Sequence, residues 1–331
     1  MAWRNFAHRC SFVQGSIFMK NTASTLFRFL FLVVVLATFT ACEKTIQVNL
    51  SEGEKQLVVE GVIESGEMPY VLLTRSIGFF DKIDFNKVDF VKGAQVRVND
   101  LTSGKSVALK EFSIDSVVGG QTFSFTVYIP DFNDPNALTF KGEFGHQYQL
   151  NIDYNNETFS AVTQIPKSTG LDSMWLEPVQ GKEQEYAILR ARYADPDTLG
   201  NCVKIQTKRQ KMVKDGFPED YFSPFNDVYD DNIINGLKVN ITVDLGFDRN
   251  REYSTEEFQY LPYVKKGDTV TVKWSAIDKS VYRFWETLAF AEGSVGNPFA
   301  SPTKVQSNVS NKAVGVWAGY GNYYFTIIDS L

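Results

Sequence analysis

Cys42 is the residue whose surroundings most clearly indicate a chemical fate. It follows an uncharged run of 13 residues, 29–41, which comes after Lys20 and Arg28. The core of a signal peptide takes about 7–15 apolar residues, whereas a membrane-spanning helix takes roughly 20. Two small residues directly precede the thiol, as in a bacterial lipobox, with Phe39 where leucine is usual. We therefore predict that residues 1–41 are a signal peptide and that Cys42 receives S-diacylglycerol and N-palmitoyl groups. The alternative is an ordinary secretory signal with an incidental cysteine.

The start of the chain affects the composition of the mature protein. Residues 1–18 fit no part of a signal peptide, whereas Met19 opens a conventional one. We expect translation to start at Met19. The alternative is that residues 1–18 are translated and form part of an unusually long, positively charged N-terminal region of the signal peptide. The mature chain, residues 42–331, has a net charge of −10 rather than −6, because the leader holds four basic residues and no acid. An acidic chain without a basic patch is not expected to bind nucleic acid.

Histidine and cysteine are nearly absent from the mature chain, which narrows its chemistry. His146 is the one remaining histidine, and Cys202 is the one thiol left if Cys42 is acylated. No intrachain disulfide and no zinc site of two or three histidines can then form. His146 could belong to a Ser-His-Asp triad, but it borders a segment, 147–152, that alternates as a strand does. We interpret it as a surface residue beside a strand.

Two acidic segments are candidates for a cation site. Asp195, Asp197 and Asn201 share one segment, but proline and leucine interrupt the every-second-residue spacing of a calcium loop, so we interpret it as a solvated turn. The cluster in 227–231 reads as an acidic loop that faces solvent. A glycosidase needs only two carboxylates, and 39 acidic residues cannot be ranked from sequence. We therefore assign no catalytic, cofactor or metal residue, and we expect no enzymatic activity.

Thr198 is a candidate for covalent modification. It follows an aspartate and precedes leucine, and Asp-Ser or Asp-Thr followed by an apolar residue occurs five times in the chain. This tripeptide resembles the O-glycosylation sequon of exported Bacteroidetes proteins. Turns that lead into strands produce the same tripeptide by chance. We predict that at least one exposed copy, Thr198 first, carries a glycan.

A β-rich domain is expected to follow the lipidated N-terminus and tether, residues 42–55. Short runs of strand-forming residues recur between turns, and Asn155-Asn156 marks a hairpin. Such a series predicts an immunoglobulin-like or transthyretin-like sandwich over residues 56–166. The expected strands are 57–63, 70–75, 94–100, 106–112, 122–129, 147–153 and 157–165.

A second β-rich domain, residues 170–331, is expected after the proline and glycine of 165–170. Its expected strands are 186–193, 202–208, 237–245, 268–276 and 323–328. One amphipathic helix near 278–292 interrupts them, because Val281, Phe284, Trp285 and Leu288 fall on one helical face. Asp278 is the expected N-cap and Gly293 the expected stop.

Aromatic residues gather near the C-terminus and allow two interpretations. The segment 296–302 and the later residues Trp317, Tyr320, Tyr323 and Tyr324 could form a surface for a protein or sugar partner. The alternative, which we favour, is that they close the core of the second domain.

Several motifs together carry a family resemblance. They are "CEKTIQVNL", "LVVEGVI", "VKGAQVRVND", "YADPDTLGNCVKI", "DDNIINGLKVNI", "KKGDTVTVKWSAIDKSVYRFWETL" and "GNPFASPTKVQSNVSNKAVGVWAGY". The chain resembles DUF4249, a family of Bacteroidetes outer-membrane lipoproteins, although Cys202-Val203 stands where the family has an aromatic pair. The resemblance implies an accessory role beside TonB-dependent receptors. It brings no catalytic residues.

We therefore expect a lipid-anchored protein of the outer membrane, facing the periplasm or the surface. Its expected role is that of a non-catalytic binding or assembly partner of a TonB-dependent receptor, without cofactors. One alternative is a surface glycan-binding protein or glycan hydrolase, and another is an envelope-structural or adhesive lipoprotein.

Overall fold

A computed structural model describes most of the chain after residue 54. The described residues are 27, 55–77, 88–118, 121–167, 169–182, 185–210, 220–249, 251–294 and 304–328. Gly53–Leu331 forms one compact unit, distinct from Met1–Glu52. The prediction of a mostly β protein is confirmed, with 50% of residues in strands and 11% in helices. None of the described helices is both long and apolar enough to cross a membrane.

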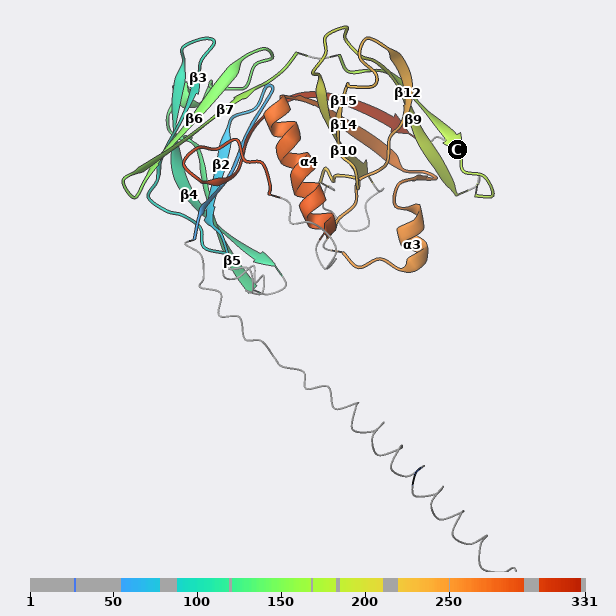
Figure 1. Cartoon of the computed structure of the whole chain (residues 1–331), viewed down its shortest axis with the longest axis horizontal. Coiled ribbons are helices and arrows are strands. Elements are labelled where there is room, and N and C mark those ends of the chain that lie inside the picture. Colours follow the sequence, from blue (N-terminus) through green and yellow to red (C-terminus); the bar gives the residue numbers. More distant parts are fainter. Residues whose placement is uncertain are drawn as a thin grey trace, which may run out of the picture. The chain divides into compact units, whose positions relative to one another are not determined.

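Seven strands of the first half curl around one core (Figure 1). They are β1 (Leu57–Glu64), β2 (Tyr70–Arg75), β3 (Gln95–Asp100), β4 (Ser106–Val118), β5 (Gln121–Pro130), β6 (Gln147–Tyr154) and β7 (Glu157–Gln164). Their order along one continuous sheet is β1-β2-β5-β4-β3-β6-β7. This continuity differs from the two separate sheets of an immunoglobulin sandwich. The predicted turn between β6 and β7 is confirmed, because Asn155 and Asn156 have φ values of 53° and 62°, as a tight hairpin turn requires.

The second half places two sheets across a shared core. Its strands are β8 (Leu171–Pro178), β9 (Tyr186–Ala194), β10 (Cys202–Gln210), β11 (Val228–Asp230), β12 (Lys238–Thr242), β13 (Val264–Lys265), β14 (Thr269–Ile277) and β15 (Val314–Ile328). One sheet has the order β12-β9-β13, with β8 also paired to β9. Leu189 and Tyr193 of this sheet pack with Ile205, Val272 and Trp274 of the other.

Strand β15 belongs to both halves of the unit. It pairs with β14 in antiparallel and with β1 in parallel orientation, so the main sheet runs through 11 strands. Trp317 of β15 is fully buried in the core of the first half, where its indole Nε1 donates to the Tyr148 carbonyl at 2.9 Å. A boundary at 165–170 stays a prediction, but the first core is completed by a residue near the C-terminus.

Helix α4 (Lys279–Ser294) covers the face of β10, β14 and β15 that is turned away from the second sheet (Figure 1). Its predicted stripe is confirmed, because Val281 and Phe284 are buried and Trp285 and Leu288 are partly buried in that layer. Asp278 Oδ1 accepts from the Val281 amide at 3.1 Å, so it caps the helix as predicted. The helix ends one residue after Gly293, which is therefore not its stop. The other helices in the described part are α2 (Pro135–Leu138) and α3 (Thr255–Tyr260).

Candidate functional site

Of the two residues predicted to be modified, the structure describes Thr198 but not Cys42. Cys42 lies outside the described residues. Thr198 lies in the turn after β9, where its side chain is exposed and its amide donates to the Pro196 carbonyl at 2.7 Å. The turn thus leaves the Thr198 hydroxyl accessible to a modifying enzyme, and glycosylation stays a prediction. Cys202 is buried, which raises the pKa of its thiol to about 11 and makes it a poor nucleophile.

In the two candidate loops, the carboxylates of Asp195 and Asp231 accept hydrogen bonds from groups of the protein itself and do not form an open cation site. The Asp195 carboxylate accepts from the Tyr193 hydroxyl at 3.0 Å and from the Gly236 amide at 3.2 Å. The Asp231 carboxylate accepts from the Gly200 and Asn201 amides at 2.8 and 2.9 Å. Among the described residues no group of three His, Cys, Asp or Glu side chains could hold a metal ion. Residues 195–201 form a turn, as interpreted, and 197–200 are exposed, but Asp195 is 7% exposed, so the interpretation of the whole turn as solvated is wrong for this residue.

The interpretation of 227–231 as a solvent-facing acidic loop is wrong. Asp227 and Asp231 are 8% and 2% exposed. Asp227 forms a buried ion pair with Lys204, while Asp230 lies 3.0 Å from Lys279 Nζ at the start of α4. The loop folds inward because its carboxylates find a buried ammonium and backbone amides, which offset the cost of leaving water.

Lys204 is a charged group of the face under α4 and is 4% exposed. Its Nζ lies 4.0 Å from the centre of the Trp285 ring. Burial lowers the pKa of this lysine, and the Asp227 carboxylate opposes the shift. Nearby, Lys273 Nζ donates to Glu64 Oε1 at 2.6 Å, and Glu64 Oε2 accepts from Asn322 at 2.7 Å. These charges join β10, β14, β15 and β1, and each has a partner, so they hold the sheet together rather than await a substrate.

A pocket of about 530 Å³ lies beside this ion pair. Two carboxylates line it, Asp227 and Glu286, together with Tyr282 and Phe290. Glu286 accepts a hydrogen bond from the Tyr282 hydroxyl at 2.8 Å, and Asp227 is paired with Lys204. Carboxylates beside aromatic rings suit the binding of a polyol or sugar better than hydrolysis, which needs one free carboxylic acid and one free base.

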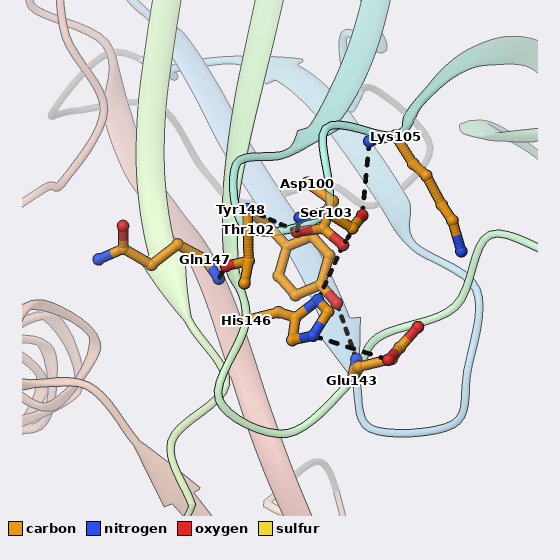
Figure 2. A network of polar contacts seen from close by, with 8 residues as sticks. All are labelled: Asp100, Thr102, Ser103, Lys105, Glu143, His146, Gln147 and Tyr148. Atoms are coloured by element: carbon orange, nitrogen blue, oxygen red, sulfur yellow. Dashed lines mark hydrogen bonds and ion pairs between the residues drawn. The ribbon is translucent and has the colours of Figure 1, made fainter.

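His146 belongs to a polar network at the end of β3 and the start of β6, which Figure 2 shows. Its Nδ1 lies 2.9 Å from Asp100 Oδ2, and its Nε2 lies 3.7 Å from Glu143 Oε2. The hydroxyl of Ser103 donates to the Asp100 carboxylate at 2.6 Å rather than to the histidine. A catalytic triad requires the serine on the imidazole. The network therefore ties a turn to a strand, and the interpretation of His146 as a strand-flanking residue is confirmed.

Asp100 is the centre of that network. It is 4% exposed, and its carboxylate accepts from the amides of Thr102 and Ser103 at 2.9 and 3.1 Å. Burial alone would raise the pKa of this carboxyl, but the hydrogen bonds from Ser103 and His146 hold it below its usual value.

Most of the aromatic residues near the C-terminus are buried, but the expectation that they close the core of the second domain is wrong for Trp317, which lies in the first core, and for Tyr320, which lies in the layer under α4. Trp317 is fully buried, Tyr320 is 7% exposed, and the Tyr320 hydroxyl accepts from Trp285 Nε1 at 3.0 Å. Tyr323 packs against the second core, and only Tyr324, at 54%, is exposed. The segment 296–302 lies outside the described residues.

The outer face of β4 and β5 carries a cluster of exposed apolar side chains that sequence reasoning missed. We name it the apolar face, and its residues are Phe90, Phe112, Ile114, Phe125, Val127 and Phe132. Ile114, Phe125 and Phe132 are 52%, 43% and 55% exposed. The Phe90 and Phe125 rings are 5.9 Å apart and those of Phe112 and Phe132 are 5.6 Å apart, so the side chains gather rather than scatter.

A polar contact borders the apolar face. Lys110, which lies on the same side of β4 as Phe112, forms an ion pair with Asp131, whereas the hydrogen bond from Ser124 to Asp115 lies on the opposite side of the two strands. Aromatic and aliphatic groups enclosed by a polar rim are typical of protein–protein interfaces. The register also places this face near the start of β1, because Leu57 pairs with Arg75, and β2 in turn pairs with β5.

Fold and surface together define a class: a mostly β protein with an exposed apolar strand face and paired internal charges. Residues 43–323 match the family described as a domain of unknown function, DUF4249. The chain therefore belongs to the DUF4249 family, as the sequence motifs predicted. The comparison with curated proteins found no match.

Proposed function

We propose that this chain is a lipid-anchored protein of the outer membrane that binds a TonB-dependent receptor without catalysing a reaction. The observation that carries the proposal is the apolar face. Monomeric proteins seldom leave three large, neighbouring apolar side chains this exposed unless they bind something. The apolar face lies near the start of β1. The proposed acylated tether, residues 42–55, leads into the same strand.

The chemistry of the apolar face favours a protein partner. Phenylalanine supplies a large contact area, and the surrounding ion pair of Lys110 and Asp131 supplies a rim that can exchange hydrogen bonds with a partner. The carboxylates of Asp227, Glu286 and Asp231 are engaged by a lysine, a tyrosine and backbone donors, which favours binding over hydrolysis at these positions.

The proposal is tested by crosslinking in native membranes followed by mass spectrometry of the captured protein. The variant Ile114→Thr/Phe125→Thr keeps strand propensity but removes exposed apolar area. Val162→Thr/Leu237→Thr is the matched control, because these side chains are 44% and 53% exposed away from the apolar face. We expect the unaltered chain and the control to capture a TonB-dependent receptor and the apolar-face variant to lose most of it. Equal capture by both variants contradicts the proposal, as does capture of no receptor.

Glycan binding is a second candidate, and the pocket beside Asp227 and Glu286 favours it. Exposed Phe290, at 60%, can stack on a sugar ring while carboxylates accept from its hydroxyls. Glu286→Gln should then weaken binding in a panel of polysaccharides. Unchanged affinity for every polysaccharide that binds would remove this candidate.

A further inference from the structure

A second cavity lies at the end of the sheet where the described chain begins. It has a volume of about 650 Å³. Four segments build it: the start of β1, the end of β2, the β6–β7 turn and the turn before β15. We call it the cationic pocket, defined by Lys55, Arg75 and Lys312 with Tyr154 and Phe159.

The charge of the pocket is opposite to that of the chain. Three basic side chains line it, and Glu157 is the one acidic residue in its lining. The whole chain has a net charge of −6. Concentrating positive charge in one concavity of an acidic protein creates a local field that attracts anions.

Arg75 is held in place and keeps donors for a ligand. Its Nη2 donates to the Tyr154 hydroxyl at 2.8 Å, its guanidinium lies 5.5 Å from the centre of that ring, and its Nε lies 3.8 Å from Asp89. A guanidinium has five N–H donors in a planar fork that matches the oxygens of phosphate. The tyrosine contact therefore orients the fork, while other donors stay able to bind an oxyanion.

Lys312 is positioned by a rigid turn. Asn311 and Lys312 have φ values of 54° and 59°. The neighbouring Ser310 amide donates to the Ser160 carbonyl at 2.8 Å, and its hydroxyl accepts from the Ser160 amide at 2.8 Å. These bonds fasten the turn to β7, so the pocket does not have to order this segment when a ligand binds.

The lining of the pocket is not uniformly polar. Leu57, Phe159 and Ala313 contribute to it and are 8%, 4% and 5% exposed. A cationic rim over an apolar floor suits a ligand that carries both a charged oxyanion and hydrocarbon. Inorganic phosphate alone would leave the floor unused.

We propose that the cationic pocket binds the phosphate of an anionic lipid headgroup, with the adjoining glycerol and first methylenes over the apolar floor. Lys55 lies 13 residues after Cys42. A tether of this length reaches at most about 45 Å, so an acylated Cys42 keeps the pocket near a bilayer. The choice of a lipid rests on the proposed acylation of Cys42, but not on the receptor partnership, which uses a different face.

The test measures binding to vesicles by co-sedimentation with the mature chain, residues 42–331, carrying Cys42→Ala, so that both the apolar leader and the acyl attachment are absent. The probes are vesicles of phosphatidylcholine with and without phosphatidylglycerol, and inorganic phosphate alone. The pocket variant is Lys55→Gln/Lys312→Asn, since asparagine tolerates the positive φ of the turn. The control is Lys141→Gln/Lys238→Gln, which removes two exposed lysines outside the pocket. Lys55→Gln alone changes an exposed side chain ahead of β1. This single variant still tests the pocket if Lys312→Asn disturbs the turn before β15.

We expect binding to vesicles with phosphatidylglycerol and none without it. Each lysine near a membrane contributes enough that Lys55→Gln should weaken binding about fivefold and the double variant about 25-fold. The control should change affinity by less than about twofold, because exposed distant charges are screened. Equal weakening by the control overturns the proposal. If inorganic phosphate abolishes vesicle binding at the concentration at which phosphate itself binds, the assignment to a lipid is overturned. If the chain binds neither the vesicles nor phosphate, both the anion site and its assignment to a lipid are overturned.

Discussion

At the scale of single residues, Asp100 and His146 illustrate how a polar network settles a question that the sequence raised. The histidine was the one candidate for acid–base chemistry, yet its Nδ1 is committed to a carboxylate 46 residues away. Because Ser103 also bonds this carboxylate, no hydroxyl is left on the imidazole to become a nucleophile. The network's effect should therefore appear in stability rather than in activity.

The first prediction concerns the pH dependence of that stability. The carboxyl of Asp100 has its pKa lowered by hydrogen bonds, so it stabilises the fold above the ordinary pKa of about 3.9, and that contribution is lost as pH falls through the lowered value. Asp100→Asn should be less stable at pH 7, and its difference from the unaltered protein should shrink in acid. Urea unfolding between pH 7 and pH 2.5 measures this, and a constant difference across that range contradicts it.

Phe125 shows what the sequence could not decide. Alternation in 122–129 identified the strand correctly, but alternation does not say which set of side chains faces the core. In the structure Thr126 and Tyr128 are 1% and 0% exposed, whereas Phe125 points outward. The buried hydroxyl of Tyr128 donates to the Val91 carbonyl, a partner 37 residues away, and this bond makes burial of the polar set possible. Such partners depend on tertiary pairing and cannot be read from a local pattern.

At the scale of elements, helix α4 was predictable almost to its ends. Its stripe, its cap at Asp278 and its place against a core all follow from local spacing. Asp278 has a second role that local spacing does not predict. Its Oδ2 also accepts from the Thr163 hydroxyl at 2.6 Å and from the Gln164 amide at 3.0 Å. One carboxylate thus caps a helix of the second half and fixes the end of β7 in the first.

The second prediction is that Asp278→Ala lowers the free energy of unfolding by about 3 kcal/mol. A lost N-cap costs about 1 kcal/mol, and hydrogen bonds to a charged group contribute about 1.5–3 kcal/mol. Asp278→Asn keeps an oxygen for the cap but cannot accept equally from Thr163 and Gln164, so its loss should be about half as large. Urea denaturation of the three proteins gives the comparison, and a loss under about 1 kcal/mol for alanine would exclude the second role.

At the scale of the whole molecule, strand β15 makes one unit of two predicted domains. The sequence indicated most strands of both sets from local alternation, but not β8, β11, β13 or residues 314–322 of β15. It could not indicate that Val58 pairs with Val314, since parallel pairing over such a separation leaves no local trace. For the same reason the contact of Trp317 with Gly61, whose added Cβ would lie 2.6 Å from the indole, was invisible to it.

The third prediction is that the described unit Gly53–Leu331 loses stability as a whole when Trp317 is truncated. Trp317→Ala leaves a cavity in the first core and should cost about 3–5 kcal/mol. If β15 couples the halves, amide hydrogen exchange should show equal losses of protection in β6 and β14, which lie in different cores. Trp317→Phe fills more of the space and should give a smaller loss in both strands. A loss confined to β6 would mean that the halves open independently.

The parallel pairing of β1 with β15 also constrains the order in which the protein can mature. Strand β1, the first of the described strands to be made, has no neighbour on one edge until β15 has been made, and the indole that fills the first core arrives with β15. Folding therefore cannot finish from the N-terminus onward, as it does in chains whose domains close one by one. During synthesis β1 can pair with β2 on one edge, but its other edge stays unpaired until β15 has been made.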